Sequence, residues 1–225
     1  MRRVGLLLLP VATALMACTS EPSQSPRPAC PTEAPTATSA QASLADAEHA
    51  TVTVSGAVEG EFVIDLLGED APLATASFVE LARCGFYDGV TFHRVLAGFV
   101  IQAGDPQTRD NRADFPGLGT GGPGYEFEIE PPPDGLRYDP YTVAMANDGS
   151  TNGSQFFIDL VDLDDALRRV GVFTIFGQVA TGTEVVDEIA AVPVGDPRTG
   201  VPLDPVVIDS IVISSEAAAS PSQDE

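Results

Sequence analysis

Apolar and polar residues alternate along several short stretches of the chain, the pattern typical of half-buried β-strands. Thr51 to Val58 and Glu61 to Leu66 alternate in this way on either side of a turn at Glu59-Gly60. The remaining predicted strands are shorter or less regular, and they cover residues 90–95, 99–103, 136–146, 154–158, 172–179 and 206–213.

Two stretches have the apolar spacing of helices instead. Residues 72–84 follow Ala71-Pro72 and place Phe78, Val79 and Ala82 on one side, with Gly85 as a stop signal. Thr183 to Ala190 forms the second predicted helix. Two helices among about eight short strands predict a mainly β fold, a closed antiparallel eight-stranded barrel capped by two helices.

The hairpin predicted between Val90 and Ala103 carries an unusual arginine. Side chains alternate along a strand, so Phe92 and Arg94 are expected on one face and His93 and Val95 on the other, toward the barrel interior. An arginine in an apolar hairpin costs free energy unless it is paired or used. Arg94 is therefore a candidate functional residue.

The N-terminus has the pattern of a targeting segment. Arg2-Arg3, the apolar run from Val4 to Leu15 and the small residue Ala17 predict a signal peptide over residues 1–17. Cys18 directly after it resembles a bacterial lipobox, in which this cysteine is lipidated; an ordinary secretory peptide with a chance cysteine is the alternative. Residues 18–49 are rich in Ser, Thr, Pro and Ala and predict a disordered tether, and residues 215–225 a flexible acidic tail.

Charge and composition exclude several functions. The formal net charge is -22, with 33 acidic residues against 11 basic ones. None of the basic residues is a lysine. The excess of negative charge would repel the phosphates of nucleic acid and of anionic membrane surfaces, which argues against both as partners. With 2 histidines a multi-histidine metal site is excluded.

Gly119 to Tyr125 predicts a tight loop rather than a phosphate site, because no Gly-Lys-Ser/Thr follows it. The carboxylates of Asp162 to Asp165 are interpreted as a solvated loop rather than a metal site.

Two motifs resemble the signature of the cyclophilin-type peptidyl-prolyl isomerases. The first runs Phe92-His93-Arg94-Val95, a short turn, then Phe99-Val100-Ile101-Gln102-Ala103-Gly104-Asp105, and Ala103 departs from the family's glycine. The second is Met145-Ala146-Asn147 followed by residues 152–158, Asn-Gly-Ser-Gln-Phe-Phe-Ile. The resemblance covers roughly residues 51–214, and the globular domain is predicted over residues 50–214. It implies a cyclophilin-like barrel without metal or cofactor.

The resemblance also implies the roles of individual residues. Arg94 would donate a hydrogen bond toward the prolyl nitrogen, Gln102 would orient its guanidinium, and Phe99 would help to form the proline pocket. The other residues implied at the substrate site are Val100, Ala146, Asn147, Gln155, Phe157, Leu167 and Phe173. Phe173 stands where the family usually has a histidine or tyrosine, and Leu167 lies where some members have a tryptophan, of which this chain has 0.

Three functions fit these features. The first is a monomeric isomerase, attached to the membrane only through its lipid, that assists folding of exported or envelope proteins by acting on proline-containing polypeptides. The second is a binding module that holds such segments without turnover, although a binder has no need of Arg94. The third is a lipoprotein barrel with a small apolar ligand in its lumen, which the large inward residues argue against.

Two further cysteines remain once Cys18 is set aside. Cys30 lies in the predicted tether and Cys84 at the end of the first predicted helix. In an exported chain a disulfide between them can persist. The alternative is two free thiols, with Cys84 a small buried apolar residue.

Overall fold

The structure is a computed structural model, and it describes residues 27–111 and 115–215. Their core is an antiparallel sheet with the strand order β3-β4-β7-β6-β8-β2-β1-β9, and a short β5 pairs with β7. The strands are β1 (His49–Gly56), β2 (Gly60–Leu66), β3 (Arg94–Leu96), β4 (Val100–Ala103), β5 (Phe127–Glu128), β6 (Thr142–Asn147), β7 (Thr151–Asp159), β8 (Ile175–Thr181) and β9 (Val206–Ser214).

The sheet curls on itself but is not a fully closed barrel, so the prediction of closure overstates the fold. Strands β3 and β9 end the strand order and do not pair along their length. The gap is bridged just before β3, where Thr91 forms an isolated antiparallel bridge with Val207. The Phe92 amide donates to the Val206 carbonyl (3.0 Å) nearby. Pairing stops there because the chain from 91 to 93 has no regular strand geometry.

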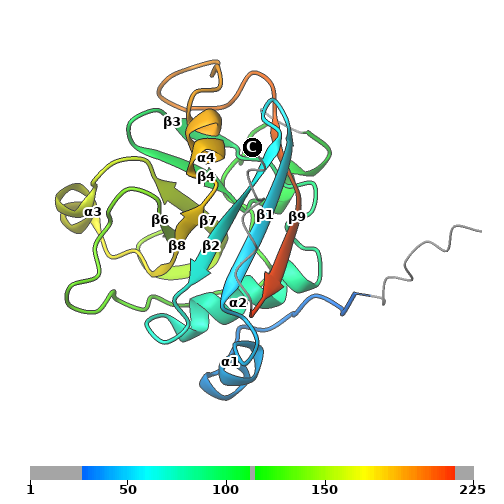
Figure 1. The fold of residues 1–225 in the computed structure, drawn as a ribbon, viewed down its shortest axis with the longest axis vertical. Helices are drawn as coiled ribbons and strands as arrows, with labels where there is room; N and C mark the ends of the chain where they lie inside the picture. Colours follow the sequence, from blue (N-terminus) through cyan, green and yellow to red (C-terminus); the bar gives the residue numbers. More distant parts are fainter. Residues whose placement is uncertain (1–26, 112–114, 216–225) are drawn as a thin grey trace, which may run out of the picture.

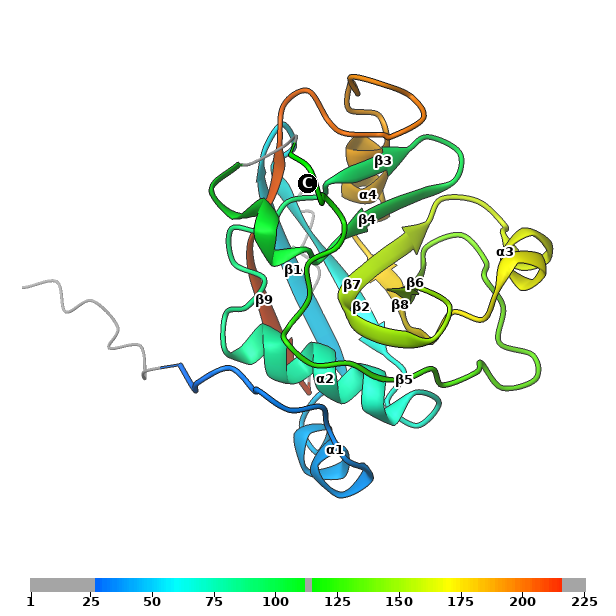
Figure 2. The ribbon, with the colours of Figure 1, turned by 180° about the vertical axis from the view of Figure 1, so that it is seen from behind.

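Two helices cover the ends of the curled sheet, as predicted (Figures 1 and 2). Helix α2 (Pro72–Arg83) crosses one end and α4 (Thr183–Ala190) the other, and both have nearly the predicted bounds. The N-cap residue of α2 makes no side-chain cap. Instead the Glu130 carboxylate, distant in sequence, accepts from the Leu73 (2.9 Å) and Ala74 (2.8 Å) amides. No helix in residues 27–111 or 115–215 is long and apolar enough to cross a membrane.

Side chains fill the space between the helices and the sheet. Five rings, those of Phe78, Tyr87, Phe92, Phe156 and Phe176, are fully buried and pack against one another with centroids 5.0–6.4 Å apart. Aliphatic residues of β1, β2, β6 and β9 complete this barrel core. The interior is thus packed with the protein's own side chains, which argues against a ligand carried in the lumen.

The segment predicted as a disordered tether is partly ordered. From residue 27 onward it is described, and it contains helix α1 (Ala37–Ser43), which packs on α2 with Ala40 fully buried. A disulfide joins Cys30 to Cys84, and Arg83 of α2 donates to the Ser43 carbonyl (3.0 Å). These contacts stabilise the segment, whose composition offers few large apolar residues, because a helix this short needs tertiary partners. The signal peptide, Cys18 and the C-terminal tail lie outside the described residues, apart from residue 215.

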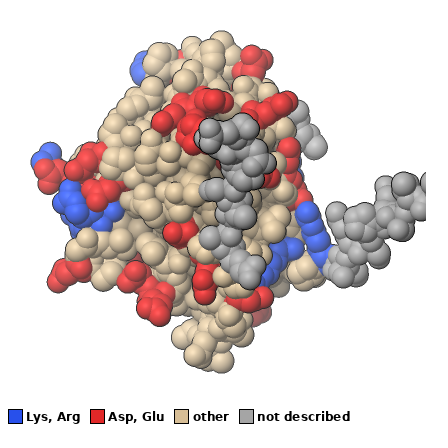
Figure 3. Space-filling view, in the orientation of Figure 1, with Lys and Arg blue, Asp and Glu red and all other residues tan. Residues whose placement is uncertain are grey.

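The acidic stretch after β7 also differs from the solvated loop that was predicted. Helix α3 (Asp164–Val170) begins there. Elsewhere in the chain, a 3-10 helix, η1 (Pro106–Asn111), follows β4. The Asp164 carboxylate is buried and accepts from the Tyr138 amide (3.2 Å) and from Arg168 (2.9 Å). Its pKa is held below the usual range by these bonds and by the arginine charges, which outweigh desolvation, the largest single influence. Figure 3 shows acidic and basic side chains side by side in this region, with acidic groups scattered over the rest of that face.

Candidate active site

Most of the predicted site residues lie on four neighbouring strands, β3, β4, β7 and β6. Arg94 on β3 is the cross-strand partner of Gln102 on β4, and Gln102 in turn faces Phe157 on β7. Phe157 is paired with Ala144 on β6. Because side chains directly opposite one another project from the same face of a sheet, the register puts these residues in one row. That face is turned away from the barrel core, since the intervening Ile101, Phe156 and Ile158 belong to that core.

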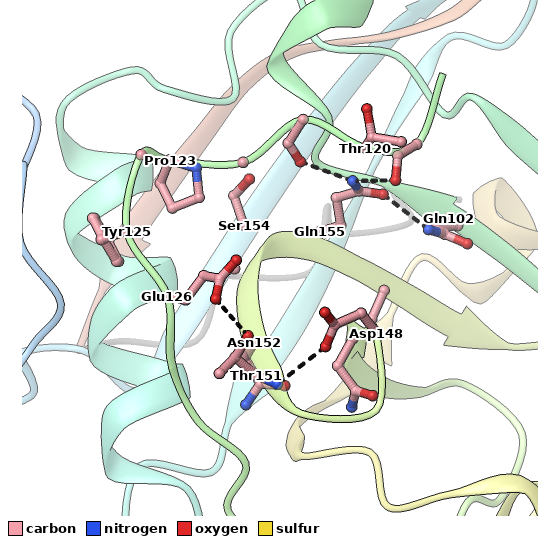
Figure 4. A pocket seen from close by; sticks show the side chains of 17 residues that line it. Gln102, Thr120, Pro123, Tyr125, Glu126, Asp148, Thr151, Asn152, Ser154 and Gln155 are labelled. Atoms are coloured by element: carbon pink, nitrogen blue, oxygen red, sulfur yellow. Dashed lines mark hydrogen bonds between the residues drawn. The ribbon is translucent and has the colours of Figure 1, made fainter. Parts of the chain in front are cut away.

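A relay of hydrogen bonds fixes the arginine. Arg94 Nη1 donates to Gln102 Oε1 (3.2 Å), and Gln102 Nε2 donates to Gln155 Oε1 (3.0 Å). Gln155 Nε2 then donates to the carbonyls of Gly119 (2.9 Å) and Gly121 (2.8 Å), as Figure 4 shows. Arginine only donates and a carbonyl only accepts, so both glutamine amides have a single consistent orientation. The Arg94 guanidinium is therefore held in place by a network that runs through the two glutamines to the glycine-rich loop.

The glycine-rich loop is fastened to a buried carboxylate. Asp105 is fully buried, and its oxygens accept from the Gln107 (2.8 Å) and Gly119 (2.7 Å) amides. A Cβ at Gly121 would lie 2.0 Å from Asp105 Oδ1, so only glycine fits there. The predicted tight loop thus has a clear physical reason. It holds Gln155 in place, and no phosphate is needed to explain its glycines.

An apolar cluster lies next to the arginine on the same side of the sheet. We call it the outer apolar cluster; its buried members are Val100, Tyr138, Ala144, Phe157, Leu163, Leu167 and Ile175, with Phe99, Ala146 and Phe173 packed against them. The Phe157 and Phe173 rings meet edge to face with centroids 5.5 Å apart. The six apolar residues predicted at the substrate site, Phe99, Val100, Ala146, Phe157, Leu167 and Phe173, all belong to it.

Tyr138 is a contributor that sequence reasoning missed. Its hydroxyl donates to the Phe173 carbonyl (2.7 Å) and accepts from the Phe173 amide (3.1 Å). Burial raises the pKa of this phenol, so it stays neutral. Both backbone groups of Phe173 are thereby fixed, and with them the position of its ring in the outer apolar cluster. No local pattern around residue 138 signals this role, because its partner lies 35 residues away.

Asn147 has its side chain engaged within the protein. Its Nδ2 donates to the Val172 carbonyl (2.9 Å), and its Oδ1 accepts from the Gly149 amide (2.9 Å). Ala146 and Asn147 nevertheless line the cleft beside Gln102, together with Gln155. The side chain of Asn147 therefore shapes the loop, and its main chain is available for contact with a peptide.

His93 lies elsewhere than predicted. Phe92 and Val95 both belong to the barrel core, whereas His93 lines a cleft together with Arg94. The expected alternation fails because residues 91–93 are irregular and β3 begins only at Arg94. His93 is 4% exposed, and burial lowers its pKa to about 4, against the opposing influence of Asp105. It is therefore neutral at pH 7 and unsuited to act as an acid.

The electrostatics of Arg94 favour a role toward a substrate. The side chain is partly buried, and this lowers its pKa without bringing it near neutrality, since guanidinium groups stay charged. No carboxylate forms an ion pair with it among the described residues. A half-buried cation held only by an amide keeps donor capacity for a ligand.

Two clefts meet at this arginine network. The first has a volume of about 920 Å³ and lies between the glycine-rich loop, the end of β6 and the start of β7 (Figure 4). The second has a volume of about 920 Å³ and lies between Arg94 and the loop from 195 to 203. Gln102 and Gly119 line both. No group of three or more histidine, cysteine or acidic side chains fit to hold a metal occurs in the part of the chain that the structure describes.

Comparison with known proteins gives the same family throughout. The family model described as cyclophilin type peptidyl-prolyl cis-trans isomerase/CLD matches residues 49–213. Peptidyl-prolyl cis-trans isomerase B of Streptomyces anulatus is 43% identical over 174 residues, covering 69% of this chain and 92% of that protein. Peptidyl-prolyl cis-trans isomerase A of Mycobacterium tuberculosis is 43% identical over 175 residues, covering 69% and 87%.

A solved structure agrees with the fold. It is the crystal structure of a cyclophilin type isomerase of Cryptosporidium parvum in the presence of the dipeptide Ala-Pro, with a TM-score of 0.63 and 30% sequence identity. The match covers 75% of this chain and 99% of that one. With a family model spanning most of the chain and relatives of this similarity, the chain belongs to the cyclophilin-type peptidyl-prolyl cis-trans isomerase family.

Proposed function

We propose that the protein catalyses cis–trans isomerisation of Xaa-Pro peptide bonds at the face formed by Arg94, Gln102 and the outer apolar cluster. The observation that carries this is the Arg94 guanidinium, held by the Gln102–Gln155 relay beside an apolar surface and without an acidic partner among the described residues. The related structure determined in the presence of Ala-Pro supports a proline-containing ligand.

The chemistry needs neither a nucleophile nor a cofactor. The barrier to rotation is the partial double bond of the amide, about 18–20 kcal/mol. A donor that binds the prolyl nitrogen localises its lone pair there and weakens that double bond. Arg94 would supply this donor, while Phe99, Val100 and Phe157 hold the proline ring out of water.

The free energy needed for catalysis requires both the hydrogen bond from Arg94 and the apolar pocket. A thousandfold to millionfold acceleration needs about 4–8 kcal/mol. One hydrogen bond to a charged group contributes about 1.5–3 kcal/mol net. The remainder must come from a dry pocket shaped for the twisted peptide, which the buried Phe157 and Val100 support.

We further propose that the enzyme acts outside the cytoplasm on exported proteins, anchored through Cys18 as a monomer. The basic and apolar run before Cys18 supports this, and so does the Cys30–Cys84 disulfide, since such bonds persist mainly in oxidising compartments. Cys18→Ser should abolish labelling by a fatty-acid analogue, whereas the double variant Cys30→Ser, Cys84→Ser should still be labelled. Labelling of Cys18→Ser equal to wild type would place the anchor elsewhere.

The rival function is a binding module without turnover. Titration of a proline-containing peptide, beside a protease-free isomerisation assay on the same peptide, separates the two. An isomerase accelerates exchange at catalytic concentrations, whereas a binder changes it only in proportion to the peptide bound. If the peptide binds to saturation and its isomerisation is not accelerated, the result would favour the binding module.

A further inference from the structure

The second cleft lies directly beside β3, the strand that carries Arg94. The loop from 193 to 203, coloured orange in Figures 1 and 2, runs next to β3. The Val95 amide, adjacent to Arg94, donates to the Gly200 carbonyl (2.7 Å). A Cβ at Gly200 would lie 2.5 Å from the Val95 carbonyl oxygen, so this close approach requires glycine. The loop is thus fastened to the strand that carries the arginine.

The loop is internally ordered as well. The Leu203 amide donates to the Pro193 carbonyl (2.8 Å), and the Gly195 amide donates to the Val201 carbonyl (2.9 Å). At its tip the Gly200 amide donates to the Asp196 carbonyl (2.8 Å). These bonds give the cleft a preformed wall. Preformed walls are what ligand sites in proteins usually have.

Apart from Arg94, the cleft offers apolar surface and no unpaired charge. Leu118, Val201, Pro202 and Leu203 line it, and Leu203 is 64% exposed. His93 at its inner side is neutral at pH 7, because burial lowers its pKa to about 4. A charged residue therefore gains little here against the loss of its hydration.

The charges of the loop at the rim compensate one another. Arg198 donates to Asp196 Oδ2 at 2.8 Å, so these two charges compensate one another. Arg94 remains as a cation that lines this cleft, and in the proposed reaction its guanidinium is engaged at the prolyl bond. Lining and charge together select an uncharged apolar occupant.

We propose that this cleft is a specificity subsite for a large apolar residue of the same polypeptide whose prolyl bond lies at Arg94. The inference rests on the proposed isomerase function and names part of its substrate class. The proposal rests on the continuity of the cleft with the isomerase site, because Arg94 and Gln102 belong to both. A polypeptide bound across Arg94 therefore reaches the cleft within one or two residues. The other occupants, an acidic residue or none, are outcomes of the test.

The test uses two peptide series with Leu, Gly or Glu, either two residues before the proline or directly after it. Each peptide is assayed for kcat/KM without a protease on wild type, Leu203→Ser and Val212→Ser. Val212 is a matched control, because it is 57% exposed on β9 and does not line the cleft. In one series wild type should prefer Leu over Gly by about fivefold or more. Leu203→Ser should lose this preference, and Val212→Ser should keep it.

Several results would overturn the subsite. These are equal rates for Leu and Gly in both series, a preference for Glu, or a Leu preference that survives in Leu203→Ser. Calorimetric binding of the same peptides keeps the test independent of turnover. Wild type that binds the Leu peptide more tightly than the Gly peptide but catalyses neither would refute the isomerase function and leave the subsite standing.

Discussion

A single buried acid should make the stability of this protein depend on pH. Asp159 at the end of β7 is fully buried, and neither carboxyl oxygen has a hydrogen-bond partner in the part of the chain that the structure describes. It lies two residues after Phe157, and so on the side of the outer apolar cluster. Burial, and to a lesser extent the charge of Asp139, raises its pKa to about 8. The folded protein therefore holds a neutral acid there at pH 7.

The sign and size of the effect follow from proton linkage. An unfolded aspartate titrates near pH 3.9, so between about pH 4 and pH 8 the folded state keeps a proton that the unfolded state releases. The free energy of unfolding therefore falls as pH rises through that window. At about 1.36 kcal/mol per pH unit, the cost at pH 7 has an upper limit of about 4 kcal/mol. Asparagine matches the shape and stays neutral, so Asp159→Asn should be more stable at pH 7 by about 1–4 kcal/mol.

Urea unfolding of wild type and Asp159→Asn at pH 4.5, 7 and 8.5 measures this. The gain should be at most about 1 kcal/mol at pH 4.5 and should grow toward pH 8.5. Asp204→Asn, at an exposed position, is the control and should shift stability little at any of these pH values. Parallel pH curves for wild type and Asp159→Asn, or a variant less stable at pH 7, would refute the reasoning.

Three other variants probe the pocket and the scaffold. Phe157→Ala should weaken peptide binding in calorimetry and lower turnover, since burying such a ring contributes about 1.5–3 kcal/mol; unchanged binding would remove Phe157 from the pocket. Replacing Cys30 and Cys84 by serine should lower the melting temperature, because the closed loop, with a sequence separation of 54, restricts the unfolded chain by up to about 4 kcal/mol; a melt unaffected by reductant would contradict this. Glu130→Ala should cost about 1–2 kcal/mol in urea unfolding, as the amides at the start of α2 lose their acceptor, with isomerase activity retained; an equal midpoint would show that water replaces the cap.

Much of the scaffold could be predicted from local pattern. The helix at 183–190 and the strands on either side of Glu59-Gly60 follow from apolar spacing and turn residues, and the structure has them with nearly those bounds. The site residues came instead from the two family motifs. Pairing of Arg94 with Gln102 follows from the hairpin register once its turn is known.

What the sequence did not predict depends on contacts between distant segments. Helix α1 is too short and too polar to be stable alone, and it depends on the disulfide and on Arg83 of α2. The acid at Asp159 becomes unusual only through burial, and its strand partner Val100 on β4 lies far away in the chain. His93 lies off the predicted face because strand alternation does not extend across residues 91–93, which have no regular strand geometry.

The most direct test of the central claim is the rate of prolyl isomerisation by Arg94 variants. A protease-free assay on a short Xaa-Pro peptide compares wild type, Arg94→Ala and Arg94→Lys, with melting temperatures to show that all three are folded. A charge-assisted contact used in the transition state is worth more than about 1.4 kcal/mol, so Arg94→Ala should lose at least about tenfold in kcat/KM. Arg94→Lys should fail too, because a lysine lacks the planar fork that Gln102 braces. Folded variants with wild-type kcat/KM would contradict the assignment of Arg94 as the catalytic residue.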